Sequence, residues 1–217
     1  MIQVKQFIVN HFQVNCFVLW DESTKQCALI DPAAEMAHDV EPIDRFVAEH
    51  NLRPELILLT HPHVDHACGL RHFCERYHLP VTMHKEGEGI LSQIGSYASV
   101  MRFEVRDLRD LERQYVDDGD VLKLGDNEIE VRFVPGHCPG SVCFVLHDEK
   151  MVFTGDTLFR MSIGRTDLAG GDYDRLMERL RSRILVLDDD YQVLPGHGDL
   201  TSIGEEHLYN GFLQEQD

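Results

Sequence analysis

Apolar residues near the start of the chain fall in short groups that polar residues separate. Residues 2–9, 15–20 and 27–30 are rich in β-branched and aromatic side chains, and the polar residues 21–25 between the last two groups are typical of a turn. The pattern therefore predicts that the chain opens with three strands, paired antiparallel.

Further along the chain the apolar spacing becomes helical. Apolar residues recur every three or four positions across residues 36–50 and 70–77, which predicts a helix in each range. Short apolar runs follow at 56–59 and 81–83, and runs of this length are typical of buried strands. A further helical stretch is expected after Lys85. This alternation of helix and strand indicates an α/β fold.

The second half of the chain repeats the first in outline. Turn residues at 125–127 and 147–150 separate predicted strands, and Asp172 can cap the helix that follows them. A closing helix is expected at 203–213. Two sheets packed face to face, with helices outside, would bury all these strands, although periodicity alone does not separate this arrangement from other α/β layouts. The strands predicted in this half are residues 121–124, 129–134, 142–146, 151–154 and 191–194.

Length and charge narrow the possible classes of function. A chain of 217 residues predicts one domain, 1–217, with a substantial core. Because 38 acidic residues face 20 basic ones, the surface repels a phosphate backbone, and no nucleic-acid partner is expected. No signal peptide or membrane span is recognisable, so we expect a cytoplasmic protein without a membrane partner. Nothing in the sequence implies a protein partner.

The six cysteines form no CxxC pair and no spacing typical of a disulfide scaffold. Reduced, mostly buried thiols are therefore expected. Cys138 has two possible roles, because it directly follows a candidate metal ligand. A structural role is favoured, and exposure to oxidation or to a metal is the alternative.

Four side chains that can bind a metal occur within six residues, directly after the predicted strand 56–59: His61, His63, Asp65 and His66. Imidazole nitrogen and carboxylate oxygen suit zinc, iron or manganese. Three histidines and one aspartate exceed what a single tetrahedral site with an open position requires. The cluster therefore predicts a second metal ion.

Three further candidate ligands stand alone, and each follows an apolar strand through a glycine: His137, Asp156 and His197. Glycine permits the tight turn that aims a side chain back over the edge of a sheet. The seven candidates together fit two metals that share one carboxylate.

This ordered set resembles that of the metallo-β-lactamase superfamily, over nearly the whole chain. The resemblance implies a four-layer αβ/βα sandwich and two divalent metal ions, with zinc favoured and iron or manganese as alternatives. It also implies the division of the ligands: His61, His63 and His137 on one metal, Asp65, His66 and His197 on the other, and Asp156 as the bridge.

The remaining histidines share no such setting and are assigned to surface or packing roles. Asp31 ends a predicted strand and has two possible roles, as a plain turn residue or as a carboxylate partner of a ligand histidine. The histidines outside the metal set are His11, His38, His50, His72, His78, His84, His147 and His207.

Within the superfamily, residues 155–159, 164–167, 195–198 and 201–204 resemble the short bacterial glyoxalase II-like proteins, which are similar to hydroxyacylglutathione hydrolase. The resemblance implies that a small-molecule thioester of the S-lactoylglutathione type is cleaved through a metal-bridging hydroxide. Full-length glyoxalase II has a C-terminal helical domain that helps to hold glutathione, and we expect no such domain after His197 here.

Arg165 is the candidate substrate-binding residue, because it stands near where the similar enzymes have a basic residue for the substrate. A salt bridge with Asp167 in the same loop is the alternative role.

Four alternative functions stay open at the level of sequence. Persulfide dioxygenase has a similar Gly-Arg-Thr-Asp segment but uses one iron and fewer of these ligands. Lactonases share the ligand set. Classical β-lactamase activity is disfavoured, since those enzymes generally place cysteine where Asp156 stands. A metal-stabilised binding module without catalysis requires an intact site to be idle.

Overall fold

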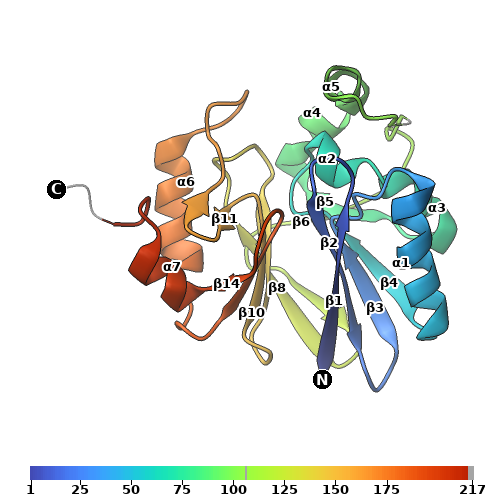
Figure 1. Cartoon of the computed structure of the whole chain (residues 1–217), viewed down its shortest axis with the longest axis horizontal. Helices are drawn as coiled ribbons and strands as arrows, with labels where there is room; N and C mark the ends of the chain where they lie inside the picture. The colour runs from blue at the N-terminus through green and yellow to red at the C-terminus, as the bar shows by residue number, and fades with distance from the viewer. Residues whose placement is uncertain (106, 215–217) are drawn as a thin grey trace.

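Two six-stranded sheets form the centre of the molecule. The computed structural model describes residues 1–105 and 107–214. In Figure 1, α1 and α3 cover the outer face of one sheet, and α6 and α7 cover that of the other. This arrangement confirms the predicted α/β four-layer sandwich.

The first sheet contains the N-terminal strands in chain order. Strands β1 to β3 pair antiparallel, and β3 to β6 pair parallel. Its strands are β1 (Ile2–Val9), β2 (Val14–Asp21), β3 (Gln26–Ile30), β4 (Arg53–Leu58), β5 (Val81–His84) and β6 (Arg113–Val116).

The second sheet contains the C-terminal strands in the order β14-β13-β10-β9-β8-β7. Its pairs are antiparallel except for β10 with β13, which is parallel. Its strands are β7 (Val121–Leu124), β8 (Asn127–Phe133), β9 (Val142–Leu146), β10 (Met151–Gly155), β13 (Gln192–Pro195) and β14 (Thr201–Ser202). A separate small hairpin contains β11 (Leu158–Phe159) and β12 (Ser162–Ile163).

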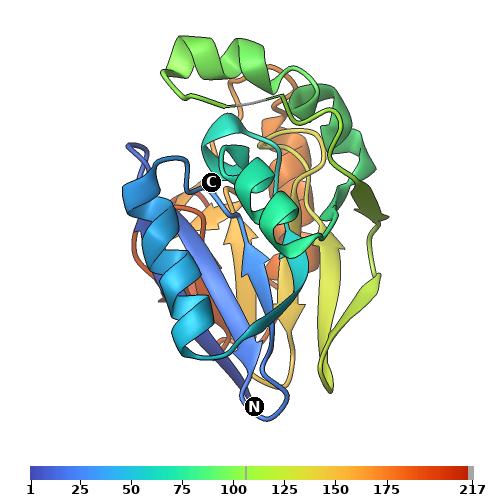
Figure 2. The same cartoon turned by 90° about the vertical axis from the view of Figure 1, so that its right-hand side faces the viewer.

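The helices lie on the outer faces and at one end of the sandwich. Figure 2 shows α1 along the outside of the first sheet and α5 across one end of the molecule. The helices are α1 (Ala37–Glu49), α2 (Val64–Ala67), α3 (Leu70–Tyr77), α4 (Glu88–Leu91), α5 (Ile94–Met101), α6 (Tyr173–Arg179) and α7 (Ile203–Tyr209), with a 3₁₀ turn at Lys85–Gly87 and a π-helical turn at Leu180–Ile184.

Apolar side chains fill the spaces between the layers. Between the two sheets, the rings of Phe17 and Phe153 meet edge to face with centroids 5.2 Å apart. Under α1, Ile43 is buried in the cluster that covers the first sheet, and under α6, Leu176 is buried against the second. The positions that recur with helical spacing in the sequence are therefore the positions at which these helices are buried.

Several short elements were not predicted. Strand β6 has one buried residue, Val116, so it lacks the alternation that marks a strand. Strands β11, β12 and β14 and helix α2 are too short for any periodicity to register.

The closing helix is shorter than predicted, because it ends at Tyr209 rather than at residue 213. The Asn210 amide donates to the carbonyl of Ser162 and to Oε2 of Glu206, which holds the chain out of the helix. In the part of the chain that the structure describes, no helix has the length and apolar character needed to cross a membrane.

Candidate metal centre

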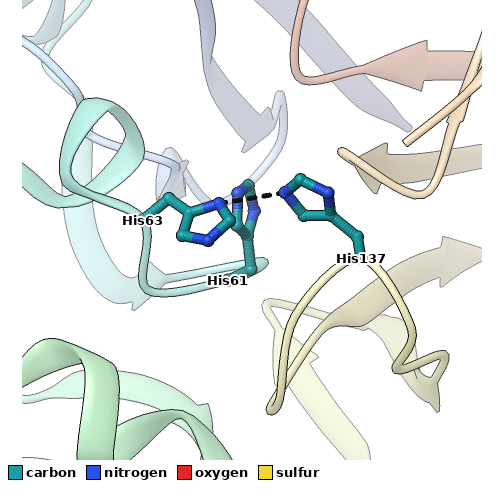
Figure 3. A group of neighbouring side chains, drawn as sticks. All are labelled: His61, His63 and His137. Carbon is teal, nitrogen blue, oxygen red and sulfur yellow. Dashed lines mark hydrogen bonds between the residues drawn. The ribbon is translucent and has the colours of Figure 1, made fainter. Parts of the chain in front are cut away.

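All seven predicted ligands converge at one edge of the sandwich. The first four lie on the loop and helix α2 that follow β4, and the others follow β8, β10 and β13. Each of these strands ends at the same edge, so residues far apart in the sequence meet there. Figure 3 shows the rings of His61, His63 and His137 facing one another across this edge.

Two compact groups form among the predicted ligands, and a third group, of Asp31, His61 and His66, overlaps both. In the first, potential ligand atoms of His61, His63 and His137 all lie within 4.8 Å of one another. Nδ1 of His63 is 2.9 Å from Nε2 of His137, as the dashed line in Figure 3 marks. The second group contains Asp65, His66 and His197, and also lies within 4.8 Å.

Asp156 stands between the two groups and faces both. Its Oδ2 lies 3.6 Å from Nε2 of His137 and 3.9 Å from Nε2 of His61. Its Oδ1 lies 3.2 Å from Nε2 of His66 and 3.6 Å from Nε2 of His197. One oxygen of the carboxylate is therefore directed at each group.

Buried polar atoms in the cluster lack hydrogen-bond partners. Among the described residues, Nε2 of His61 and Oδ1 of Asp156 are buried and make no hydrogen bond of acceptable geometry. Leaving such atoms unpaired costs about 1–3 kcal/mol each. A divalent cation accepts lone pairs from both atom types, so the donor set fits a metal. The donor atoms of this cluster therefore suit the metal ions that the sequence predicts.

The electrostatics of the cluster differ between the two groups. Burial lowers the pKa of His61 well below its usual value, with neighbouring histidines adding to the effect, and burial with the charge of His137 lowers the pKa of His63 to about 4. Burial opposes protonation of His66, but the Asp156 carboxylate and its neighbours raise the pKa of His66 above its usual range. His61 and His63 are therefore neutral near pH 7, which is the form of imidazole that binds a metal.

Asp31 holds His66 from behind. The carboxylate is buried, and its Oδ2 lies 2.8 Å from Nδ1 of His66. The backbone N–H and the hydroxyl of Thr60 donate to it at 2.7 and 2.6 Å. Its backbone is left-handed, with a φ of 47°. Asp31 is therefore both a turn residue and the carboxylate partner of a candidate ligand, so the two roles left open by the sequence coexist.

Backbone carbonyls orient two other candidate ligands. Nδ1 of His137 lies 2.8 Å from the carbonyl of Arg165, and Nδ1 of His197 lies 3.1 Å from that of Phe12. Each carbonyl accepts from Nδ1–H, which leaves the lone pair on Nε2, the nitrogen that faces the cluster. Sequence analysis did not identify these carbonyls, because every residue has one.

The predicted role of the preceding glycines is correct at two positions. Gly155 has a φ of 49° and Gly136 a φ of 135°, which favour glycine. Gly196 differs, since its φ is not in the left-handed region. A Cβ there would lie 2.5 Å from Oδ1 of Asp156 and 2.6 Å from Cε1 of His66. Glycine is needed at this position for space rather than for the turn.

The residues assigned to other roles stay outside the two groups. Of the eight other histidines, only His84 is buried, and its ring stacks on that of Phe133 at 3.9 Å. All six cysteines are buried and free. Burial raises the pKa of the Cys138 thiol to about 12, so its structural role is favoured over its exposure.

A cleft of about 480 Å³ opens over the metal-binding edge. Arg165 lines it together with members of both ligand groups. Nε and one terminal nitrogen of Arg165 donate to the two carboxylate oxygens of Asp167, at 2.8 Å each. The loop salt bridge is therefore present, and the guanidinium lies beside the cleft.

A family model described as the metallo-beta-lactamase superfamily matches residues 9–197. The chain therefore belongs to the metallo-β-lactamase superfamily, whose fold it shares, and it is a hydrolase of that superfamily with groups of residues suited to binding metal.

Proteins of known name share nearly the full length of the chain. The hydroxyacylglutathione hydrolase GloC of Haemophilus influenzae is 34% identical over 96% of this chain and 96% of its own. A solved structure of the B3 metallo-beta-lactamase BLEG-1 has a TM-score of 0.88 and 31% identity, covering 98% of this chain and 100% of its own. The structure of TTHA1623 in a di-iron-bound form has a TM-score of 0.85 and 32% identity, covering 96% and 100%.

Asp31→Asn tests the contact behind the metal-binding edge. Asparagine tolerates the left-handed backbone but removes the charge that faces His66. We expect the affinity for metal to fall about 10- to 100-fold, which competition with a chelator would measure. Asp44→Asn is the matched control, because Asp44 makes a similar contact with His72 at 3.0 Å outside the cluster. Equal affinities in both variants would contradict the role of Asp31.

Proposed function

We propose that the chain is a dinuclear metal-dependent hydrolase that cleaves a thioester of the S-lactoylglutathione type. The observation that carries the two-metal part is the position of Asp156, with one oxygen directed at each ligand group. The similarity to a hydroxyacylglutathione hydrolase supports the thioester part.

In this proposal each of the two groups would hold one divalent ion, and Asp156 would contribute a carboxylate oxygen to each. Zinc is favoured for a set of imidazoles and carboxylates, and iron or manganese are the alternatives. When bound, such ions supply Lewis acidity that activates water and stabilises negative charge on a carbonyl oxygen. The ligands of the first ion are His61, His63 and His137, and those of the second are Asp65, His66 and His197.

The protein contributes fixed geometry to this reaction. The carbonyls of Phe12 and Arg165 and the carboxylate of Asp31 keep three imidazoles oriented toward the cluster, so little reorganisation is required when a substrate binds. Water adds its oxygen to the acyl carbon and the carbon–sulfur bond breaks, giving an acid and a thiolate that takes up the proton. A thiol has a pKa of about 8.5, so the thiolate leaves without a general acid.

The one-iron alternative requires fewer ligands than the structure brings together. A persulfide dioxygenase would leave the second group, Asp65, His66 and His197, without a purpose. Lactone hydrolysis uses the same ligand set and stays a second candidate. The likeness to the B3 metallo-beta-lactamase BLEG-1 also makes β-lactam hydrolysis worth measuring, although Asp156 stands where classical enzymes generally have cysteine.

The first experiment measures metals per chain and hydrolysis of S-D-lactoylglutathione, an acyl-coenzyme A thioester, a lactone and nitrocefin. We expect about two metals per chain, and chelator-sensitive cleavage of the glutathione thioester that metal restores. Oxygen uptake on glutathione persulfide by a protein with a single iron would refute the proposal.

Substitution of two ligands tests the assignment of the site. Asp156→Ala removes the carboxylate that both groups share, so we expect the loss of at least one ion per chain and of hydrolysis. His63→Ala should lose metal and hydrolysis together. His72→Ala, outside the cluster, should keep both ions. Elemental analysis of the purified variants provides the readout, and full occupancy in either ligand variant would show the assignment to be wrong.

We also propose that Arg165 binds one carboxylate of the glutathione part, in exchange for Asp167. Arg165→Ala should then raise the KM for the glutathione thioester about fivefold, since an exposed ion pair contributes at most about 1 kcal/mol, and leave kcat unchanged. Arg160→Ala is the control, because Arg160 pairs with Asp199 in an exposed contact. Both changes should leave the KM for a thioester of an uncharged thiol unchanged. A rise in that KM in Arg165→Ala would contradict the proposed contact.

A further inference from the structure

The wall of the cleft above the metal-binding edge is apolar. Helices α4 and α5 lie at this end of the molecule, beside α2, which carries two of the candidate ligands (Figures 1 and 2). Imidazoles and carboxylates of the candidate metal centre line the same cleft, so the apolar side chains share it with the candidate ligands. The apolar wall consists of Phe12, Ile90, Tyr97, Met101 and Leu168.

One side of the apolar wall is built from two segments that contact each other. Nε2 of His11 lies 3.1 Å from the carbonyl of Met101, which ties the turn between β1 and β2 to the end of α5. The ring of Phe103 lies against His11 at 4.4 Å and Phe12 at 5.4 Å. The carbonyl of Phe12 in turn orients His197. Phe12 and Met101 of the apolar wall are therefore linked to a candidate ligand through these contacts.

Large side chains of the apolar wall are partly exposed. Phe12 is 43% exposed to solvent and Tyr97 is 38% exposed. Exposed apolar groups gathered in a cleft next to a metal-binding edge are typical of a ligand site, because covering them removes apolar area from water.

The charged side chains of this cleft offer few contacts for recognising a substrate. Among the described residues that line the cleft, Arg165 is the only arginine or lysine, and it is already paired with Asp167. Of the acidic residues in the cleft, Asp65 belongs to the second ligand group and Asp156 stands between the two groups. At most one anionic group of a substrate is matched there, and the rest of the contact area is apolar.

We propose that the apolar wall binds the hydrocarbon part of the acyl group, so that the enzyme prefers thioesters with an extended apolar acyl chain. This inference rests on the proposed thioester hydrolysis. Tyr97 on α5 and Leu168 on the opposite loop are the specificity-determining residues, and lactoyl is at the small end of the acyl series that the cleft accepts.

A series of thioesters of one uncharged thiol tests this preference. With acetyl, butanoyl and hexanoyl thioesters of N-acetylcysteamine, we expect kcat/KM to rise about tenfold for each two added methylenes. Tyr97→Ser and Leu168→Ser should flatten this rise. Val100→Ser is the matched control, because Val100 is 81% exposed on the same helix and does not line the cleft. A flat series in the wild-type protein, or an equal loss at every chain length in the variants, would overturn the proposal.

Binding of thioethers separates this inference from the proposed reaction. The S-ethyl and S-hexyl ethers of the same thiol cannot be hydrolysed, and calorimetry on the metal-loaded protein measures their affinity. Tighter binding of the S-hexyl ether, lost in Tyr97→Ser but kept in Val100→Ser, would support the apolar wall even if no thioester were cleaved. Equal affinity for both ethers would overturn the apolar wall and leave the proposed hydrolysis intact.

Discussion

A largely buried carboxylate that faces both groups of candidate ligands imposes the local geometry of this edge. Burying an ionised group without partners is costly, so Asp156 is stable there only among groups that offset its charge. Strand β10 delivers it through a register shift against β13 between Phe153 and Gly155, followed by the left-handed turn at Gly155. Irregular pairing of this kind re-aims a side chain beside an active site. The missing Cβ of Gly196 then leaves room for the carboxylate.

Contacts that cross from one sheet to the other hold the two halves of the site together. The Asn15 amide of β2 donates to the carbonyls of Pro195 and Gly198, both at 2.9 Å. The backbone N–H of Val142 donates to the carbonyl of Thr60 at 2.8 Å. The loops that carry His61 and His197 are therefore each tied to a strand of the opposite sheet, so the distance between these two candidate ligands depends on how the sheets pack.

Sequence analysis predicted those features that local chemistry encodes. The cluster at residues 61–66 follows a strand whose apolar run is continuous, and each isolated candidate ligand follows a glycine. Both kinds of candidate ligand could therefore be recognised from the sequence alone. The face-to-face sandwich required the family resemblance, since periodicity does not specify which sheets pack. Strand β6 was missed because only one of its residues is buried. The early end of α7 was missed because it depends on contacts of the Asn210 side chain. The carbonyl of Phe12 could not be foreseen, because its contact joins residues 185 positions apart.

The net charge of the whole chain repels an anionic substrate, whereas the charge of the metal-loaded site would attract one. The chain carries a formal net charge of −18, so an anionic thiol carrier is repelled once it comes within about a Debye length of the surface, about 8 Å at physiological salt, and salt screens the repulsion beyond that distance. At the site, Asp31, Asp65 and Asp156 contribute three negative charges, and two divalent ions would exceed them by one. Attraction is then confined to the reacting carbonyl. Contacts of short range have to supply the remaining affinity, and in this cleft the largest area available for them is apolar.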